Sequence, residues 1–227
     1  MENTKGLLIV LSIILFVVLV GFTLFNTQHY ILLSLLIMSA SFMPFMIRFT
    51  HQKLTSRELV MLAVLGAIAA VSRVPFASLP SIQPTTFVII VAAIALGPQS
   101  GFVIGVLAAI VSNLFLGQGP WTPWQMYSWG MIGLIAGLLQ KRWVMTNMIG
   151  RCMYGLIVGF LFGWVMNLWF ILGVIQEVNW IAILLYYSAS FGFDLAHALS
   201  NVFFLLLFSA SWIKILERFK RKYGLFK

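Results

Sequence analysis

The stretch TSRELVMLAVLGAIAAVSR, residues 55–73, decides the fold class of this chain. Thr55 or Ser56 can act as the N-cap of a helix and Glu58 lies in its first turn, which is a standard helix start. After Glu58 no charged side chain follows until Arg73. An uninterrupted apolar helix of this length is typical of a membrane span. We therefore expect a transmembrane helix over about 56–73.

The composition of the whole chain extends this conclusion. Hydrophobic residues make up 62% and charged residues 8% of the chain, and its mean hydropathy of +1.04 lies far outside the soluble range. A net charge of +9 would suggest nucleic-acid binding in a soluble domain. Here the basic residues lie at predicted helix ends, where they set topology and contact anionic lipid headgroups. The sequence therefore predicts an integral membrane protein with lipid contacts and no nucleic-acid partner.

The expected fold is an all-α membrane bundle. Eight segments fit transmembrane helices, at about 6–26, 29–48, 56–73, 85–97, 101–116, 125–140, 149–173 and 181–213. The first has no small-residue cleavage site, so we interpret it as a retained helix rather than a signal peptide. The last exceeds one membrane thickness, so part of it should project or break. The first two helices are plainly aliphatic. We therefore expect a two-helix N-terminal transmembrane extension, 1–53, before a six-helix membrane core, 54–227.

The basic residues also predict the orientation. Every Lys and Arg except Arg73 falls on one side of the membrane when these spans are drawn, namely Lys5, Arg48, Lys53, Arg57, Lys141, Arg142, Arg151, Lys214, Arg218, Lys220, Arg221, Lys222 and Lys227. Short loops rich in Lys and Arg stay cytoplasmic. Both termini are therefore expected inside, and the segments 74–84, 117–124 and 176–179 outside.

Several function classes lack their motifs. No Gly-x-x-x-x-Gly-Lys-Ser/Thr loop occurs, so the chain cannot hydrolyse ATP unaided. His-Glu-x-x-His, Gly-x-Ser-x-Gly and cysteine clusters are absent too; Cys152 is alone and is interpreted as a small apolar residue. Nor does the sequence show the repeated filter of a channel or the inverted repeats of a secondary transporter.

Small residues recur at helical spacing in three places. Ala63 with Ala67, and Gly66 with Ala70, form two adjacent small faces on the 56–73 helix. Such faces let another helix approach closely in lipid, and from the sequence alone packing within the chain is the preferred interpretation. Two further strips are expected to pack internally, Gly155, Gly159 and Gly163 on the seventh helix and Gly133 with Gly137 on the sixth.

Aromatic residues crowd the second Pro-rich external loop. Trp121, Trp124, Tyr127 and Trp129 follow one another within nine residues around two prolines. An interfacial aromatic belt and a ligand-stacking surface both explain this density, and the sequence leaves both open.

The last helix carries a polar face. Asp194, His197 and Asn201 are spaced three and four apart, so their side chains lie on one side. A carboxylate deep in a span must pair or face a cavity. The simplest expectation is a structural Asp194–His197 pair, extended to Asn113 or Asn167; a ligand site is the alternative. A hydrolase triad with Ser200 is excluded, because residues on one helix lack the convergent geometry.

Residues 54–227, about three quarters of the chain, resemble the substrate-binding S components of energy-coupling factor (ECF) vitamin transporters. The likeness rests on LAVLGAIAA at 62–70, the loop after Arg73, GPQSG at 97–101, GQGPWTPW at 117–124 and Asp194-x-x-His197. Such proteins bind one vitamin or precursor outside and associate with a transmembrane coupling subunit and two ABC-type ATPases. The resemblance implies a bacterial plasma-membrane protein that is not an enzyme. It also implies that the chain itself binds no metal or cofactor and that the partner subunits use the ATP.

The resemblance also implies where the site lies. The family's Ala-x-x-x-Ala surface for the coupling subunit maps to Ala63 and Ala67, and Gly66 and Ala70 are assigned to the same face. Segment 74–84 becomes a lid over a pocket lined by 117–125 and by the outer ends of the last three helices. The substrate-binding residues expected on this basis are Arg73, Phe76, Gln83, Gln118, Trp121, Trp124, Tyr127, Tyr187 and Asp194.

The Trp- and Pro-rich loop is most similar to cobalamin-specific members, which makes cobalamin the expected substrate. Riboflavin or another flat vitamin would suit the same aromatics, whereas anionic folate would need more external cations than Arg73. His197 is a conceivable axial cobalt ligand, but its depth favours a structural role. A self-contained membrane enzyme or exporter using Asp194 and His197 is the alternative, and it predicts activity without any ATPase.

Overall fold

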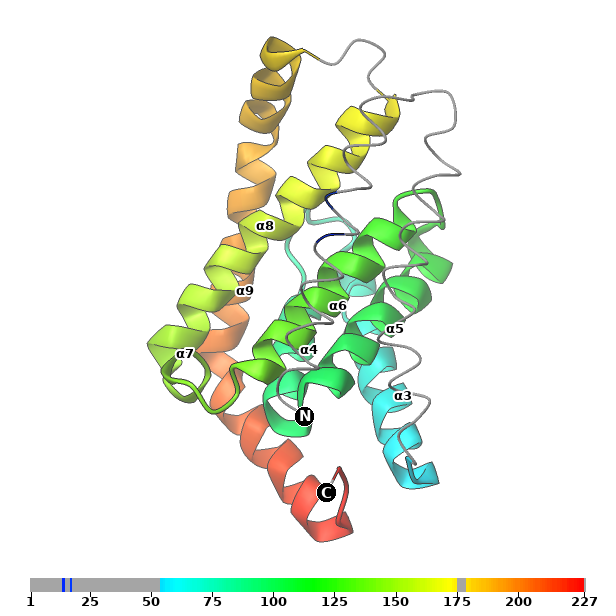
Figure 1. Cartoon of the computed structure of the whole chain (residues 1–227), viewed down its shortest axis with the longest axis vertical. Helices are drawn as coiled ribbons and strands as arrows, with labels where there is room; N and C mark the ends of the chain where they lie inside the picture. Colours follow the sequence, from blue (N-terminus) through cyan, green and yellow to red (C-terminus); the bar gives the residue numbers. More distant parts are fainter. Residues whose placement is uncertain (1–13, 15–16, 18–53, 175–178, 227) are drawn as a thin grey trace.

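The computed structural model describes residues 54–174 and 179–226, together with Ile14 and Val17. Its elements are α3 (Ser56–Val71), η1 (Val74–Phe76), α4 (Thr85–Leu96), α5 (Pro98–Leu116), α6 (Thr122–Leu138), α7 (Trp143–Thr146), α8 (Met148–Val174) and α9 (Trp180–Tyr223). All regular structure in these ranges is helical, which confirms the all-α prediction for this part of the chain (Figure 1). The helices expected at 6–26 and 29–48 lie outside the described residues, so the six-plus-two arrangement stays a prediction.

Four of the described helices are long and apolar enough to cross a membrane, namely α3 with its continuation to Phe76, α5, α8 and α9. Helix α5 begins at Pro98 rather than at 101, because Gly97, at φ 100°, makes the whole turn and proline is well placed at the first helical position. Helix α9 is unbroken and continues to Tyr223, ten residues beyond the predicted end of the span at about 213. The expectation that this segment contains a break is therefore wrong, and the other expectation, that part of it projects from the membrane, stays a prediction.

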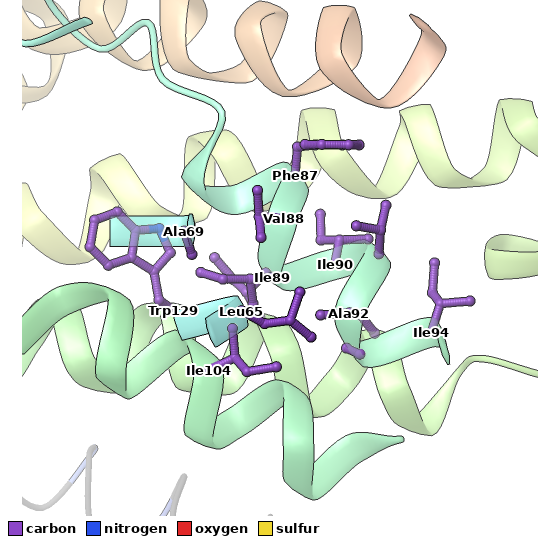
Figure 2. Packing of buried hydrophobic residues seen from close by; sticks show 14 of the residues in the cluster. Leu65, Ala69, Phe87, Val88, Ile89, Ile90, Ala92, Ile94, Ile104 and Trp129 are labelled. Atoms are coloured by element: carbon purple, nitrogen blue, oxygen red, sulfur yellow. The ribbon is translucent and has the colours of Figure 1, made fainter. Parts of the chain in front are cut away.

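Helix α4 lies at the centre of the bundle and contacts α3, α5, α6 and α9. All of its residues are buried, which explains why its sequence is apolar on every side. Figure 2 shows Phe87, Val88 and Ile90 leaving this helix in different directions, with Leu65 of α3 and Ile104 of α5 beside it. At 12 residues α4 is only ~18 Å long, so it is a buried central helix that is too short to cross the hydrocarbon core of a membrane.

Glycine lets two helix pairs approach to backbone contact. A Cβ at Gly101 of α5 would lie 2.6 Å from the carbonyl oxygen of Gly133 on α6. A Cβ at Gly159 of α8 would lie 2.5 Å from the Cα of Ala198 on α9. Gly155 and Gly163 also face α9, where they make room for the side chains of Leu205 and Asp194. The prediction that these strips pack within the chain is confirmed.

The start of α3, helix α7 and the end of α9 lie at the same end of the bundle (Figure 1). Basic residues lie in or next to these segments, with Arg57 in the first turn of α3, Lys141 and Arg142 just before α7, and Lys220, Arg221 and Lys222 in the last turn of α9. That this end faces the cytoplasm stays a prediction. The chain end also folds back onto α3 here. Thr55 and Glu58 form a capping box, and the backbone N–H of Phe226 donates to the carboxylate of Glu58.

Candidate functional site

A pocket of about 390 Å³ lies between the 81–83 segment, α8 and α9. It is lined by Ser81 and Gln83 from the segment, by Phe162, Gly163, Met166 and Asn167 from α8, and by Tyr186, Ala189, Ser190, Phe193, Asp194 and His197 from α9. Of the predicted lining, the 74–84 loop and two of the last three helices, α8 and α9, contribute residues, whereas α6 does not. The 117–125 segment does not line it.

Asp194 is the one carboxylate among the described lining residues and is only 5% exposed. It fits there because Gly163 on α8 lacks a side chain; a Cβ at that position would collide with the Asp194 carboxylate. Its Oδ2 accepts from the Ser190 hydroxyl at 3.3 Å, and the same hydroxyl also lies 3.1 Å from the Tyr187 carbonyl oxygen. The Asn167 amide donates to that hydroxyl at 2.6 Å. The carboxylate therefore receives hydrogen bonds from two neutral side chains, Ser190 and Asn167.

His197 is tied to the loop rather than to Asp194. Its Nδ1 lies 3.1 Å from the Ser81 carbonyl oxygen and its Nε2 lies 3.3 Å from the Thr86 hydroxyl, which in turn accepts from the Trp129 indole N–H at 3.2 Å. With the proton on Nδ1, both ring nitrogens are satisfied by neutral groups. The ring also stacks on Phe162 at 5.2 Å. The predicted Asp194–His197 pair is wrong, and His197 has no free nitrogen to offer a cobalt ion.

Arg73 holds the 81–83 segment through Gln83, two residues after the carbonyl that His197 contacts. Its Nε donates to Gln83 at 2.8 Å, and its Nη1 donates to Ser112 at 2.6 Å and to Asn113 at 3.1 Å. The guanidinium also lies over the Trp129 ring, 4.9 Å from its centroid. These contacts join α3, α5 and α6 to the 81–83 segment. Asn113, expected beside Asp194, belongs to this network instead.

Some of the predicted substrate-binding residues line the pocket and others do not. Gln83 and Asp194 line the pocket, whereas Arg73 reaches it only through Gln83. The others do not line it: Phe76 contacts Phe204, Tyr187 donates to the Trp164 carbonyl, and Gln118 accepts from Thr122, while Trp121, Trp124 and Tyr127 lie on or beside α6. Their roles in binding stay predictions.

The aromatic cluster is an interior feature. Trp124 and Trp129 are fully buried, Trp129 stacking on Phe162 at 4.8 Å, and Trp121 makes an edge contact with Trp169 at 5.7 Å. The full burial of Trp124 and Trp129 contradicts the interfacial belt as an explanation of these two residues, whereas ligand stacking stays a prediction. Sequence reasoning missed the aromatic residues that do line the pocket, Phe162, Tyr186 and Phe193, because nothing distinguishes them from the many other aromatics of α8 and α9.

Of the two small-residue faces of α3, one is exposed and the other is buried. Ala63 and Ala67 are exposed, among exposed Val60, Val64 and Ile68. Gly66 and Ala70 are buried, and Gly66 faces Leu107 of α5. Gly66 and Ala70 therefore pack within the chain and do not lie on the exposed face to which they were assigned.

Four described helices suited to spanning a membrane define a multi-pass membrane protein, and a small pocket lies between two of them, α8 and α9, and the 81–83 segment. The sequence model of the family described as "ECF transporter, substrate-specific component" matches residues 57–219, most of the chain. The chain belongs to this family.

Curated relatives include a UPF0397 protein of Aliivibrio salmonicida, 30% identical over 43% of this chain and 57% of that protein. Another from Aliivibrio fischeri strain MJ11 is 32% identical over 37% of this chain and 49% of that protein. The chain thus spans about half the length of the curated relatives it matches. No solved structure matches the chain significantly.

Proposed function

We propose that the chain is the substrate-binding subunit of an ATP-driven ECF importer and that the pocket under the 81–83 segment holds the substrate. The observation that carries this proposal is the pocket itself, enclosed by a loop that His197 and Arg73 hold in place, in a chain of the ECF substrate-specific family. The pocket would take a vitamin-sized molecule from outside, and partner ATPases would supply the energy for its release inside.

The partner surface we propose is the exposed Ala63–Ala67 face of α3. Small side chains there let a helix of a coupling subunit approach closely, and the flanking valines and isoleucine supply apolar contact area. The face lies on the same helix that ends at Arg73, so docking and substrate binding would share one rigid element.

Replacing Ala67 by Trp tests the docking surface. The full chain is co-expressed with a coupling subunit and two ABC ATPases, and co-purification is measured. Because a bulky ring keeps the partner helix away, Ala67→Trp should reduce recovery of the complex at least about tenfold, as expected for a change at the centre of an interface. Ala210→Trp, at an exposed alanine of α9, is the matched control and should leave recovery unchanged. Equal recovery of both variants contradicts the proposed surface.

The size of the pocket bears on the substrate. Small-molecule sites have volumes of roughly 300–1,000 Å³, and about 390 Å³ is near the lower end. This volume suits a ligand with one or two ring systems better than a corrin macrocycle with its nucleotide tail. Cobalamin, predicted from the loop composition, therefore enters the binding test below as a competitor to smaller vitamins, riboflavin among them.

A further inference from the structure

Asp194 lacks the positive partner that a buried carboxylate needs. It lies fourteen residues into α9, ~21 Å from the start of the helix, and its hydrogen bonds come from the neutral side chains of Ser190 and Asn167. A carboxylate has room for about four hydrogen bonds. Among the residues that the structure describes, no Lys, Arg or His forms an ion pair with it. Burying such a group is expensive in a membrane bundle unless a positive charge meets it.

The other polar groups of the lining carry no charge. Gln83, Asn167 and Ser190 are neutral side chains, and His197 is neutral because its two nitrogens are bonded to Ser81 and Thr86. Asp194 is therefore the sole charged side chain among the lining residues. The nearby cation, Arg73, is already held by Gln83, Ser112, Asn113 and the face of Trp129, outside the lining.

Aromatic residues accompany the carboxylate. Phe162 and Phe193 line the pocket from α8 and α9, and Tyr186 lines it about two turns before Asp194. Aromatic faces attract cations as well as flat rings, and this attraction is strengthened where water is excluded. An acidic group with aromatic walls is complementary to a flat molecule with a positive charge, and it repels an anion.

We propose that the pocket selects a small heteroaromatic cation, such as a ring-bearing amine or a quaternised ring, and that Asp194 is its counter-ion. This inference rests on the proposed function and specifies the substrate class. The ring lies between the aromatic residues of α8 and α9, its positive charge meets Asp194, and Gln83 and Asn167 serve its neutral polar groups. The depth of the carboxylate makes the interaction strong, because binding removes water from both charges.

Calorimetry on the purified full-length chain in detergent tests the proposal. The probes are thiamine and pyridoxamine as cations, pyridoxine and riboflavin as neutral molecules, folate as an anion, and cobalamin. Pyridoxamine and pyridoxine form a matched pair, because they share a ring and differ in an amine against a hydroxyl. We expect the tightest ligand to be a cation. The proposal is overturned when the ligand with the highest affinity is neutral or anionic, or when no cation binds. This comparison of affinities uses the unmodified chain.

Asp194→Asn tests the counter-ion itself. The amide keeps the size and accepts from Ser190 but removes the charge, so affinity for the tightest cation should fall by roughly 10- to 100-fold. Glu217→Gln removes a charge from an exposed position of the same helix and should leave affinity unchanged. The melting temperature of ligand-free Asp194→Asn should not fall, since an unpaired charge has been removed; a fall would indicate a structural carboxylate. Unchanged affinity in Asp194→Asn, or a fall in this melting temperature, overturns the proposal.

The two proposals fail separately. A chain that assembles with the ECF partners in an Ala67-dependent manner, yet binds a neutral vitamin regardless of Asp194, contradicts only the counter-ion. A chain that binds a cation through Asp194 but never assembles with a coupling subunit contradicts only the importer.

Discussion

The contact between α8 and α9 at Gly159 should tolerate no added atom. Replacing Gly159 by Ala places a Cβ 2.5 Å from the Cα of Ala198 and 2.9 Å from its Cβ and N. Carbon atoms in ordinary contact lie ~3.5–4.0 Å apart. The obstacle is backbone, which cannot rotate away as a flexible side chain can, so the two helices must separate locally by about 1 Å. The pocket begins one turn further along α8, at Phe162 and Gly163.

The expected cost follows from this overlap. Overpacking a close-packed interior costs about 1–3 kcal/mol, which is roughly 5- to 150-fold in the unfolding equilibrium constant. Gly→Ala in a helix also contributes up to ~1 kcal/mol of stability through backbone entropy. A second glycine separates these effects, because Gly192 on α9 is exposed and a Cβ there meets nothing within 4 Å. Gly192→Ala therefore receives the entropic gain without the overlap.

Denaturant titration of both variants in the same detergent measures the difference. We expect Gly159→Ala to be about 1–3 kcal/mol less stable than Gly192→Ala, and to bind ligand more weakly because the pocket walls have moved apart. The reasoning is refuted when the two variants unfold at the same denaturant concentration, since that result would mean that α8 and α9 do not meet at Gly159.

Two further predictions concern the loop that covers the pocket. Arg73→Lys should lower the free energy of unfolding by about 1–2 kcal/mol, because one ammonium cannot replace the planar fork that bonds Gln83 and α5; Arg218→Lys, at an exposed site of α9, should be neutral in the same titration. His197→Phe keeps an aromatic ring but loses the bond to the loop carbonyl, so amides of 79–84 should exchange hydrogen several-fold faster while those of 98–116 stay unchanged. Unchanged exchange at 79–84 contradicts the role given to the histidine.

The sequence predicted the helices more reliably than it predicted their neighbours. The segments expected at 56–73, 85–97 and 149–173 agree closely with the observed α3, α4 and α8. Caps, prolines and the length of apolar runs are local signals, and helix formation in a membrane depends mainly on them. The glycine strips were also interpreted correctly, because only close helix contact explains small residues at that spacing.

The candidate site was predicted less well. Gln83 and Asp194, predicted from the family resemblance, do line the pocket. Trp121 and Trp124 were expected beside them but do not line the pocket: Trp124 is fully buried, and the partly buried Trp121 contacts Trp169. Loop composition describes which side chains are available and not the direction in which they point.

The sequence by itself determined that this is an all-helical membrane protein, with its charges at helix ends and a carboxylate deep in the last helix. Only the tertiary structure decided which apolar faces are interior, and that Ala63 and Ala67 are exposed whereas Gly66 and Ala70 are buried. It also decided that His197 binds the loop, so that no cationic side chain of the described residues meets Asp194. In a soluble protein the polar side of a helix identifies its outer face. In lipid both sides are apolar, so the pattern along one helix cannot distinguish them, and the contacts between helices decide.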